Sequence, residues 1–261
     1  MIYNNEEQIF SNLNEWAISG CHTILISGLP GVGKTYMAKE YAKLLHIPDI
    51  ISLSPAVADL REAINQCIGL TNKIVVIIEN LDTGVLSASN ILLKFIEEPP
   101  ANVYIVITCH STSNVPNTVL SRCFAIDMVC PSPSDIQKYA MHVNASRYAQ
   151  VVNTPIWHMA HTFTDVDTIL GLSQSQIDYL THLPALSAFK DTVMSMAWKY
   201  GHYADGTTIP VPFILNYIYC TASNDRIKQL CFKAIKDLNS ISIAPHAIMS
   251  KFLMDCKYNL I

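Results

Sequence analysis

The first half of the chain alternates short continuous apolar runs with longer segments whose apolar residues recur at helical spacing. The predicted strands cover 22–27, 49–54, 74–78, 103–108 and 124–128, and the predicted helices cover 34–45, 57–68, 85–96 and 117–121. Pro99 and Pro100 end the third of these helices. Such alternation predicts a parallel sheet with helices on both faces, which is an α/β fold.

The pattern changes after the last predicted strand. Proline and serine residues at 131–135 interrupt it, and Ser134 or a neighbour can cap the helix that follows. Beyond this point only helices are predicted, with a boundary at 182–187. We expect three domains: an α/β domain at 1–130, a small helical domain at 131–182 and a C-terminal helical domain at 183–261.

The composition indicates a subunit of a larger assembly. Only 15% of the 261 residues are charged, compared with about 25% in ordinary soluble domains, and 50% are hydrophobic. Much of the surface is therefore expected to be covered by partners. The net charge of -4 provides no strongly basic surface, so contact with nucleic acid should be limited or shared with other chains.

The cysteine and histidine spacings predict neither a zinc site nor a disulfide framework. The eight cysteines include no C-x-x-C pair and fit reduced thiols in a cytoplasm. His158 and His161 could share a helix face, but no cysteine or acid near them completes a ligand set. No secretory leader and no membrane-spanning stretch are expected, so we predict neither export nor a membrane partner.

The sequence GLPGVGKT, which starts at Gly28, is typical of a phosphate-binding loop because it follows a predicted strand and opens a predicted helix. Gly28, Gly31 and Gly33 would let backbone N–H groups turn toward the phosphates of a nucleotide. Lys34 would reach the β and γ phosphate oxygens, and the Thr35 hydroxyl would ligate Mg²⁺. The motif predicts ATP and Mg²⁺ as cofactors. The alternative is a glycine-rich turn without a ligand.

Two stretches downstream, LSASNILLKFIEEPPANVYIVIT at 86–108 and NTVLSRC at 117–123, resemble a segment of sliding-clamp loader subunits nearly word for word. These subunits are AAA+ ATPases of the bacterial DNA polymerase III gamma and delta-prime type. HIPDIISLSP at 46–55 is similar to a delta-prime stretch, and residues 239–255 look like the closing helix of the family's collar. The resemblance implies an AAA+ nucleotide-binding domain, a helical lid and an oligomerising collar for the three predicted domains.

The resemblance gives Arg122 a role that composition could not. In the family, the arginine of S-R-C, which lies downstream of a threonine matching Thr118, reaches the γ-phosphate of ATP held by a neighbouring subunit. The planar guanidinium fork suits this contact, known as an arginine finger in trans. The alternative is a surface arginine bonded to nearby carbonyls. Thr108 takes the family's sensor position, where a polar side chain orients the attacking water.

The end of the predicted strand at 74–78 departs from the family. Counted eleven residues back from Asn90, the family's Mg-organising aspartate falls on Glu79 and its catalytic glutamate falls on Asn80. Glu79 can still support Mg²⁺, but Asn80 cannot accept a proton from water, and losing a positioned base costs about 10² to 10⁴ in rate. Asp82 is interpreted as a helix cap. We expect ATP binding to survive and hydrolysis to be slow.

Other departures concern the lid and DNA. The resemblance is poor at 140–180, the helical lid region shows no clear counterpart of the family's sensor arginine, and the family's zinc module is missing. The loop at 82–90, which faces DNA in the family, has no lysine or arginine, so Ser87, Ser89 and the amides of a helix N-terminus are the local donors expected for phosphate. Direct contact with DNA should therefore be weak.

These features predict a clamp-loader subunit that binds ATP, supplies Arg122 to an adjacent subunit and helps to load a sliding clamp onto primer-template DNA. Its partners would be other clamp-loader subunits, the clamp and the DNA. One alternative is a self-sufficient, homo-oligomeric AAA+ ATPase such as a helicase loader or a DNA-repair remodeller. Another is a rigid scaffold subunit that never binds nucleotide, although the complete GLPGVGKT argues against it.

Overall fold

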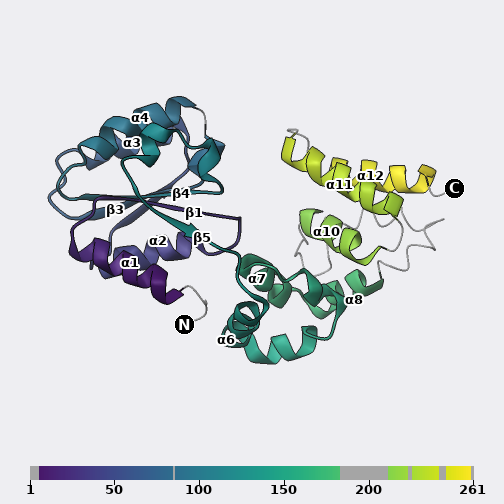
Figure 1. Cartoon of the computed structure of the whole chain (residues 1–261). Coiled ribbons are helices and arrows are strands. Elements are labelled where there is room, and N and C mark those ends of the chain that lie inside the picture. The colour runs from purple at the N-terminus through teal and green to yellow at the C-terminus, as the bar shows by residue number, and fades with distance from the viewer. Residues whose placement is uncertain (1–5, 85, 183–210, 223–224, 241–244, 260–261) are drawn as a thin grey trace. The chain divides into compact units, whose positions relative to one another are not determined.

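The computed structural model describes residues 6–84, 86–182, 211–222, 225–240 and 245–259 (Figure 1). The chain divides into two compact units. The first comprises Met1–Tyr139 with Thr162–Thr164, and the second comprises Ala140–His161 with Asp165–Ile261. The first unit is α/β and the described part of the second is helical.

Five parallel strands form the sheet of the first unit in the order β2-β3-β4-β1-β5. The strands are β1 (Thr23–Gly28), β2 (Ile50–Leu53), β3 (Ile74–Ile78), β4 (Val103–Cys109) and β5 (Phe124–Met128). Every residue of β1, β3 and β4 is buried, whereas the edge strands β2 and β5 are partly exposed. The three central strands are continuously apolar because helices cover both of their faces. The predicted α/β fold is confirmed.

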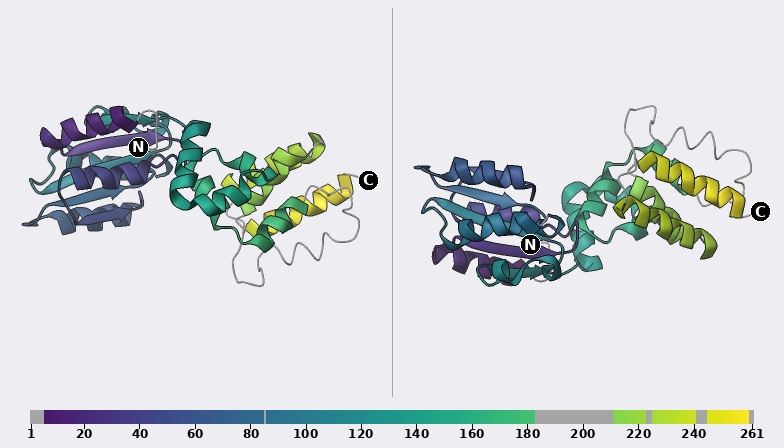
Figure 2. Two further views of the ribbon diagram at one scale, coloured as in Figure 1. Left: turned by 90° about the horizontal axis from the view of Figure 1, so that it is seen from below. Right: turned by 90° about the horizontal axis from the view of Figure 1, so that it is seen from above.

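Two pairs of helices cover the two faces of this sheet (Figures 1 and 2). Helices α1 (Glu6–Ile18) and α2 (Lys34–Leu44) lie on one face, and α3 (Val57–Cys67) and α4 (Leu86–Glu97) lie on the other. The short helix α5 (Asn117–Leu120) follows β4 and packs beside α4. All four predicted helices of this region are present, with bounds shifted by at most one residue.

Helix α1 was not predicted. Its buried residues Ile9 and Leu13 are four positions apart and pack into the same core as α2. The spacing of these two residues in the sequence could therefore have predicted the helix.

The remaining described helices begin where the sequence pattern changes. Helix α6 starts at Pro133, and Ser132 caps it, since the backbone N–H of Asp135 donates to Ser132 Oγ at 3.3 Å and the N–H of Ser132 donates to Asp135 Oδ2 at 2.9 Å. The later elements are η3 (Pro155–Met159), α7 (Phe163–Gly171), α8 (Gln174–His182), α10 (Val211–Thr221), α11 (Asp225–Ser240) and α12 (Pro245–Asn259). In the described ranges after β5, every regular element is a helix.

One apolar core joins the helices of the second unit. Leu180 of α8, Phe213 of α10, Cys231 of α11 and Phe252 of α12 all belong to it. Residues 183–187 of the predicted boundary lie outside the described residues, so the division into three domains stays a prediction. Among the described residues, no helix combines the length and apolar character needed to cross a bilayer.

Candidate nucleotide site

The candidate site lies where the carboxyl ends of β1, β3 and β4 meet. β4 pairs with β1 through Ser27 and Cys109, and it pairs with β3 through Ile78 and Ile107. Parallel strands end at one edge of a sheet, so the phosphate loop, the end of β3 and the end of β4 come together there.

Three glycines shape the loop between β1 and α2. Gly28, Gly31 and Gly33 have φ values of 149°, 78° and 96°, a region that favours glycine. A Cβ atom on Gly28 would lie 2.7 Å from the carbonyl oxygen of Met128, and one on Gly31 would lie 2.5 Å from Thr162 Oγ1. At Gly28 and Gly31, a side chain is therefore excluded both by the backbone conformation and by the close contact of neighbouring atoms. No side chain caps α2 at Gly33, so that helix terminus remains suited to an anion.

Lys34 lies inside this loop. Its Nζ donates to the carbonyl oxygens of Gly28 at 2.7 Å and Leu29 at 2.9 Å, and the residue is only 7% exposed. Burial lowers the pKa of the Lys34 ammonium, while the Cys109 and Asp82 side chains act in the opposite direction. Thr35 follows at the start of α2 and is partly buried. The predicted phosphate-binding residues are thus gathered at one point.

A segment far along the chain supports the loop from outside. The backbone N–H of Phe163 donates to the carbonyl oxygen of Gly31 at 3.1 Å, and Thr162 and Thr164 flank Gly31. These residues belong to the same compact unit as the loop.

The end of β3 brings together the other predicted site residues. Glu79 Oε1 accepts a hydrogen bond from Ser52 Oγ at 2.6 Å. Asn80 has a left-handed backbone with φ of 53°, and its N–H donates to Thr108 Oγ1 at 3.0 Å. The Thr108 hydroxyl is buried and therefore helps to fix the turn after β3. Whether it also orients water stays a prediction.

Asp82 is not a helix cap, and that interpretation was wrong. It lies within the 3-10 turn η1 (Leu81–Thr83), and its carboxylate instead binds His110 at the end of β4. The backbone N–H of His110 donates to Asp82 Oδ1 at 3.0 Å, and ring Nδ1 lies 3.2 Å from Oδ2. Sequence reasoning missed His110, although a polar residue directly after a buried central strand was a usable indication.

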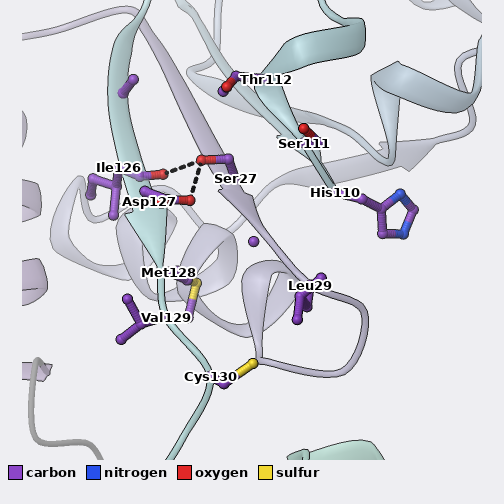
Figure 3. Close-up of a pocket in the computed structure, with 12 residues that line it drawn as sticks. Ser27, Leu29, His110, Ser111, Thr112, Ile126, Asp127, Met128, Val129 and Cys130 are labelled. Atoms are coloured by element: carbon purple, nitrogen blue, oxygen red, sulfur yellow. Dashed lines mark hydrogen bonds between the residues drawn. The ribbon is translucent and has the colours of Figure 1, made fainter.

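A cavity of about 620 Å³ opens beside the phosphate loop (Figure 3). Gly28 and Leu29 of the loop line it, together with His110–Thr112 after β4 and residues 125–130 of and after β5. On its β5 side, Ser27 Oγ lies 2.8 Å from Asp127 Oδ1 and 3.2 Å from the carbonyl oxygen of Ile126. The phosphate loop therefore borders an open cavity that is partly lined by polar groups.

Arg122 lies away from this edge, in the turn between α5 and β5. Its Nη1 donates to the carbonyl oxygen of Thr118 at 2.8 Å and to Ser121 Oγ at 3.3 Å, while Nη2 lies 2.6 Å from Glu97 Oε1. The two side chains of the ion pair are 37% and 44% exposed. In the chain by itself, Arg122 is therefore held by nearby surface groups.

Comparisons with known proteins show what parts of the chain are similar to. The family model described as "DNA polymerase III, delta subunit" matches residues 49–131. DNA polymerase III subunit delta' of Pseudomonas aeruginosa is 26% identical over 165 residues, which are 51% of this chain and 49% of that protein. Subunit tau of Bacillus subtilis is 26% identical over 136 residues, which are 41% of this chain and 24% of that protein. Parts of the chain are therefore similar in sequence to subunits of DNA polymerase III.

Solved structures agree on the fold of the chain. A DNA polymerase III gamma subunit-related protein from Thermotoga maritima has a TM-score of 0.57 at 12% identity, covering 96% of this chain and 99% of that one. A RuvB mutant from the same organism has a TM-score of 0.53 at 13% identity, covering 95% of this chain and 81% of that one. Identities this low show the fold alone. The match to the two curated relatives spans no more than about half of either protein.

The described residues contain no group of three or more histidine, cysteine, aspartate or glutamate side chains arranged to hold a metal ion. Mg²⁺ bound with a nucleotide needs fewer protein ligands, because phosphate oxygens and water supply the rest. Thr35 and Glu79 offer the oxygen donors that this ion prefers.

Proposed function

We propose that this chain is a clamp-loader subunit that binds ATP and Mg²⁺, hydrolyses the nucleotide slowly at its own site and supplies Arg122 to an adjacent subunit. The observation that carries the proposal is the buried Lys34 inside a glycine loop at the carboxyl edge of the sheet. A lysine in this place is the usual partner of nucleotide phosphates. The similarity to DNA polymerase III subunits supports the assembly in which it would act.

Mg²⁺ would be held by the Thr35 hydroxyl and supported by Glu79. The bond from Ser52 orients the Glu79 carboxylate, which suits an ion that tolerates little distortion. When bound, Mg²⁺ would neutralise part of the phosphate charge. Thr35 lies next to Lys34 in the chain, so one phosphate group could meet both side chains.

Slow hydrolysis at this site follows from Asn80. Its amide can hold water through a hydrogen bond, but it cannot take the proton that water loses during attack. Its left-handed backbone and its bond to Thr108 hold it in a defined place. The position that the family gives to a catalytic acid would therefore bind water without activating it.

The position of Arg122 supports action on a neighbour. β5 runs parallel to β1, with Phe124 opposite Ile24 and Met128 opposite Gly28. Arg122 precedes β5, so at least roughly 13 Å of strand separate it from the phosphate loop of its own chain. To act as a finger, Arg122 would exchange its bonds to Thr118 and Glu97 for the γ-phosphate of ATP on the next subunit.

The proposed partners are other clamp-loader subunits, a sliding clamp and primer-template DNA, in the cytoplasm. All eight cysteines are free, which fits a reducing compartment. Ser89, one of the side-chain donors expected in the DNA-facing stretch, lies within α4 and is buried. Direct contact of this loop with DNA would be weak, as the missing basic residues also suggest.

Native mass spectrometry of the complex purified through this chain tests the assignment. We expect a hetero-assembly whose other chains include further AAA+ subunits and, with ATP present, a ring-shaped clamp. A homo-oligomer with substantial ATPase activity of its own would instead support the self-sufficient ATPase, for which the RuvB likeness supplies only the fold.

A further inference from the structure

His110 and Asp82 form a pair that the proposed function has not used. The pair joins the turn after β3 to the end of β4, so it spans the same edge of the sheet as Asn80 and Thr108. Asp82 is nearly enclosed, with its side chain 6% exposed, whereas the His110 side chain is 28% exposed. One end of the pair is therefore fixed inside the fold and the other meets the solvent.

The hydrogen bonds determine the tautomer of the His110 ring. An ionised carboxylate only accepts hydrogen bonds, so at 3.2 Å the ring Nδ1 must carry the proton that it shares with Asp82. In the neutral ring, Nε2 then has a free lone pair. The backbone N–H of His110 binds the other carboxylate oxygen, so both partners are held in orientation.

The pair lies beside the phosphate loop. Ser27 and Cys109 are register partners, so His110 follows β4 at the level of Gly28, where the loop begins. His110, Gly28 and Leu29 line the same cavity, and Figure 3 shows the ring turned away from Ser27 and Asp127. Asp82 is close enough to Lys34 for its charge to raise the pKa of that lysine, against the larger effect of burial.

We propose that His110, oriented by Asp82, is the general base for the hydrolysis that remains at this site; the proposal rests on ATP binding by the loop. Water oxygen forms a bond to the γ-phosphorus, and the bond from that phosphorus to the β,γ-bridging oxygen breaks, which releases ADP. The water proton passes to His110 Nε2, and Asp82 stabilises the imidazolium. Release of this proton to solvent restores the ring. His110 would thus take over the task that Asn80 cannot perform.

The competing explanation is structural, because the same bonds tie η1 to β4. The two roles differ in their dependence on Asn80. A structural defect would persist whatever residue stands at position 80, whereas a missing base would matter less once a carboxylate is restored there.

The test measures single-turnover hydrolysis of ATP in the complex purified through this chain, with the phosphate-loop lysines of the other subunits substituted. His110→Gln keeps a donor for Asp82 but has no basic nitrogen. We expect it to lower the rate about 10²-fold, with ATP affinity by calorimetry unchanged. In an Asn80→Glu background, the same substitution should change the rate by less than about threefold. Asn80→Asp provides a second background if the glutamate variant folds poorly.

Three further variants separate the explanations. His110→Ala should regain part of its rate when imidazole is added, which no repair of folding would produce. Asp82→Asn, a change at a positioning residue, should slow hydrolysis only where residue 80 is asparagine. His142→Gln changes an exposed histidine on α6 and should have no effect.

Equal rates for the wild type and His110→Gln, or equal losses in both backgrounds, would overturn the proposal. So would a wild-type site that binds ATP but shows no turnover. If the wild type fails to bind ATP at all, the proposed function itself is wrong, and the binding measurement makes that outcome distinct.

Discussion

Lys34 and Arg122 are the two cations through which this chain is proposed to contact ATP, and the structure holds them in opposite ways. Lys34 is 7% exposed and bonded to two backbone carbonyls of its own loop. Arg122 is 37% exposed and paired with Glu97, which is itself 44% exposed. Breaking an exposed ion pair costs little, typically about 0 to 1 kcal/mol, so Arg122 can move to a new partner at small cost.

The difference fits the two proposed tasks. A residue that binds nucleotide in its own chain benefits from being fixed in advance, because little entropy is lost when the ligand arrives. A residue that acts on a neighbour must remain at the surface until the neighbour is present. Surface pairing keeps Arg122 ordered without burying it. The following four predictions test this contrast and the slow hydrolysis proposed at the chain's own site.

Arg122→Ala carries the largest expected effect. ATP turnover of the assembled complex should fall about 10³-fold, because the negative charge of the transition state at the neighbouring site would lose the arginine that stabilises it. Nucleotide affinity of the isolated chain, measured by calorimetry, should not change. Arg122→Lys retains the charge but not the fork and should be nearly as slow. Normal turnover and clamp loading with Arg122→Ala would show that the residue is only a surface arginine, while Arg61→Ala on α3 serves as the exposed control.

Lys34→Ala should weaken ATP binding by the isolated chain by at least about 100-fold, since charge-assisted hydrogen bonds contribute roughly 1.5–3 kcal/mol each. The circular dichroism spectrum should be unchanged. Lys39→Ala, on the exposed side of the same helix, is the matched control and should bind like the wild type. Calorimetric affinities that are equal in Lys34→Ala and the wild type would mean that the loop is not a phosphate site.

Asn80→Glu should raise hydrolysis at this chain's own site by about 10- to 100-fold, less than a full base provides, because glutamate fits the left-handed backbone poorly. Adding Glu79→Asp should raise the rate further by improving the geometry of Mg²⁺. The rates are compared in the complex, with the other sites silenced. A wild-type site that already matches the double variant would contradict the prediction that its hydrolysis is limited by the missing acid.

Glu97→Gln should have the smallest effect. It removes the charge that holds Arg122, so turnover of the complex should rise by less than about fivefold, corresponding to an exposed pair worth at most about 1 kcal/mol. The free energy of unfolding by urea should change by no more than the same amount. Glu98→Gln, an exposed neighbour, controls for the loss of charge. A large loss of turnover would mean that Glu97 positions Arg122 for its task and does more than hold it at rest.

The α/β unit could be predicted from the sequence because its buried strands, such as Ile74–Ile78, are continuously apolar. The segments between the strands have apolar residues at helical spacing. GLPGVGKT likewise places Lys34 by local rules alone. The pairing of Asp82 with His110 could not be predicted in this way, since it joins residues 28 positions apart through the order of the strands. Neither the sequence nor the structure of the single chain shows the contact proposed for Arg122, because its partner would belong to another chain.

The hydrogen bond from Phe163 to Gly31 has a consequence for how the protein can be divided and synthesised. The phosphate loop lies near the start of the chain, yet the group that supports its Gly31 carbonyl comes after the predicted end of the nucleotide-binding domain at residue 130. A fragment cut at that boundary would lack this support. On the ribosome, the loop would reach its final form only after residue 164 had emerged, so a minimal nucleotide-binding fragment has to extend at least that far.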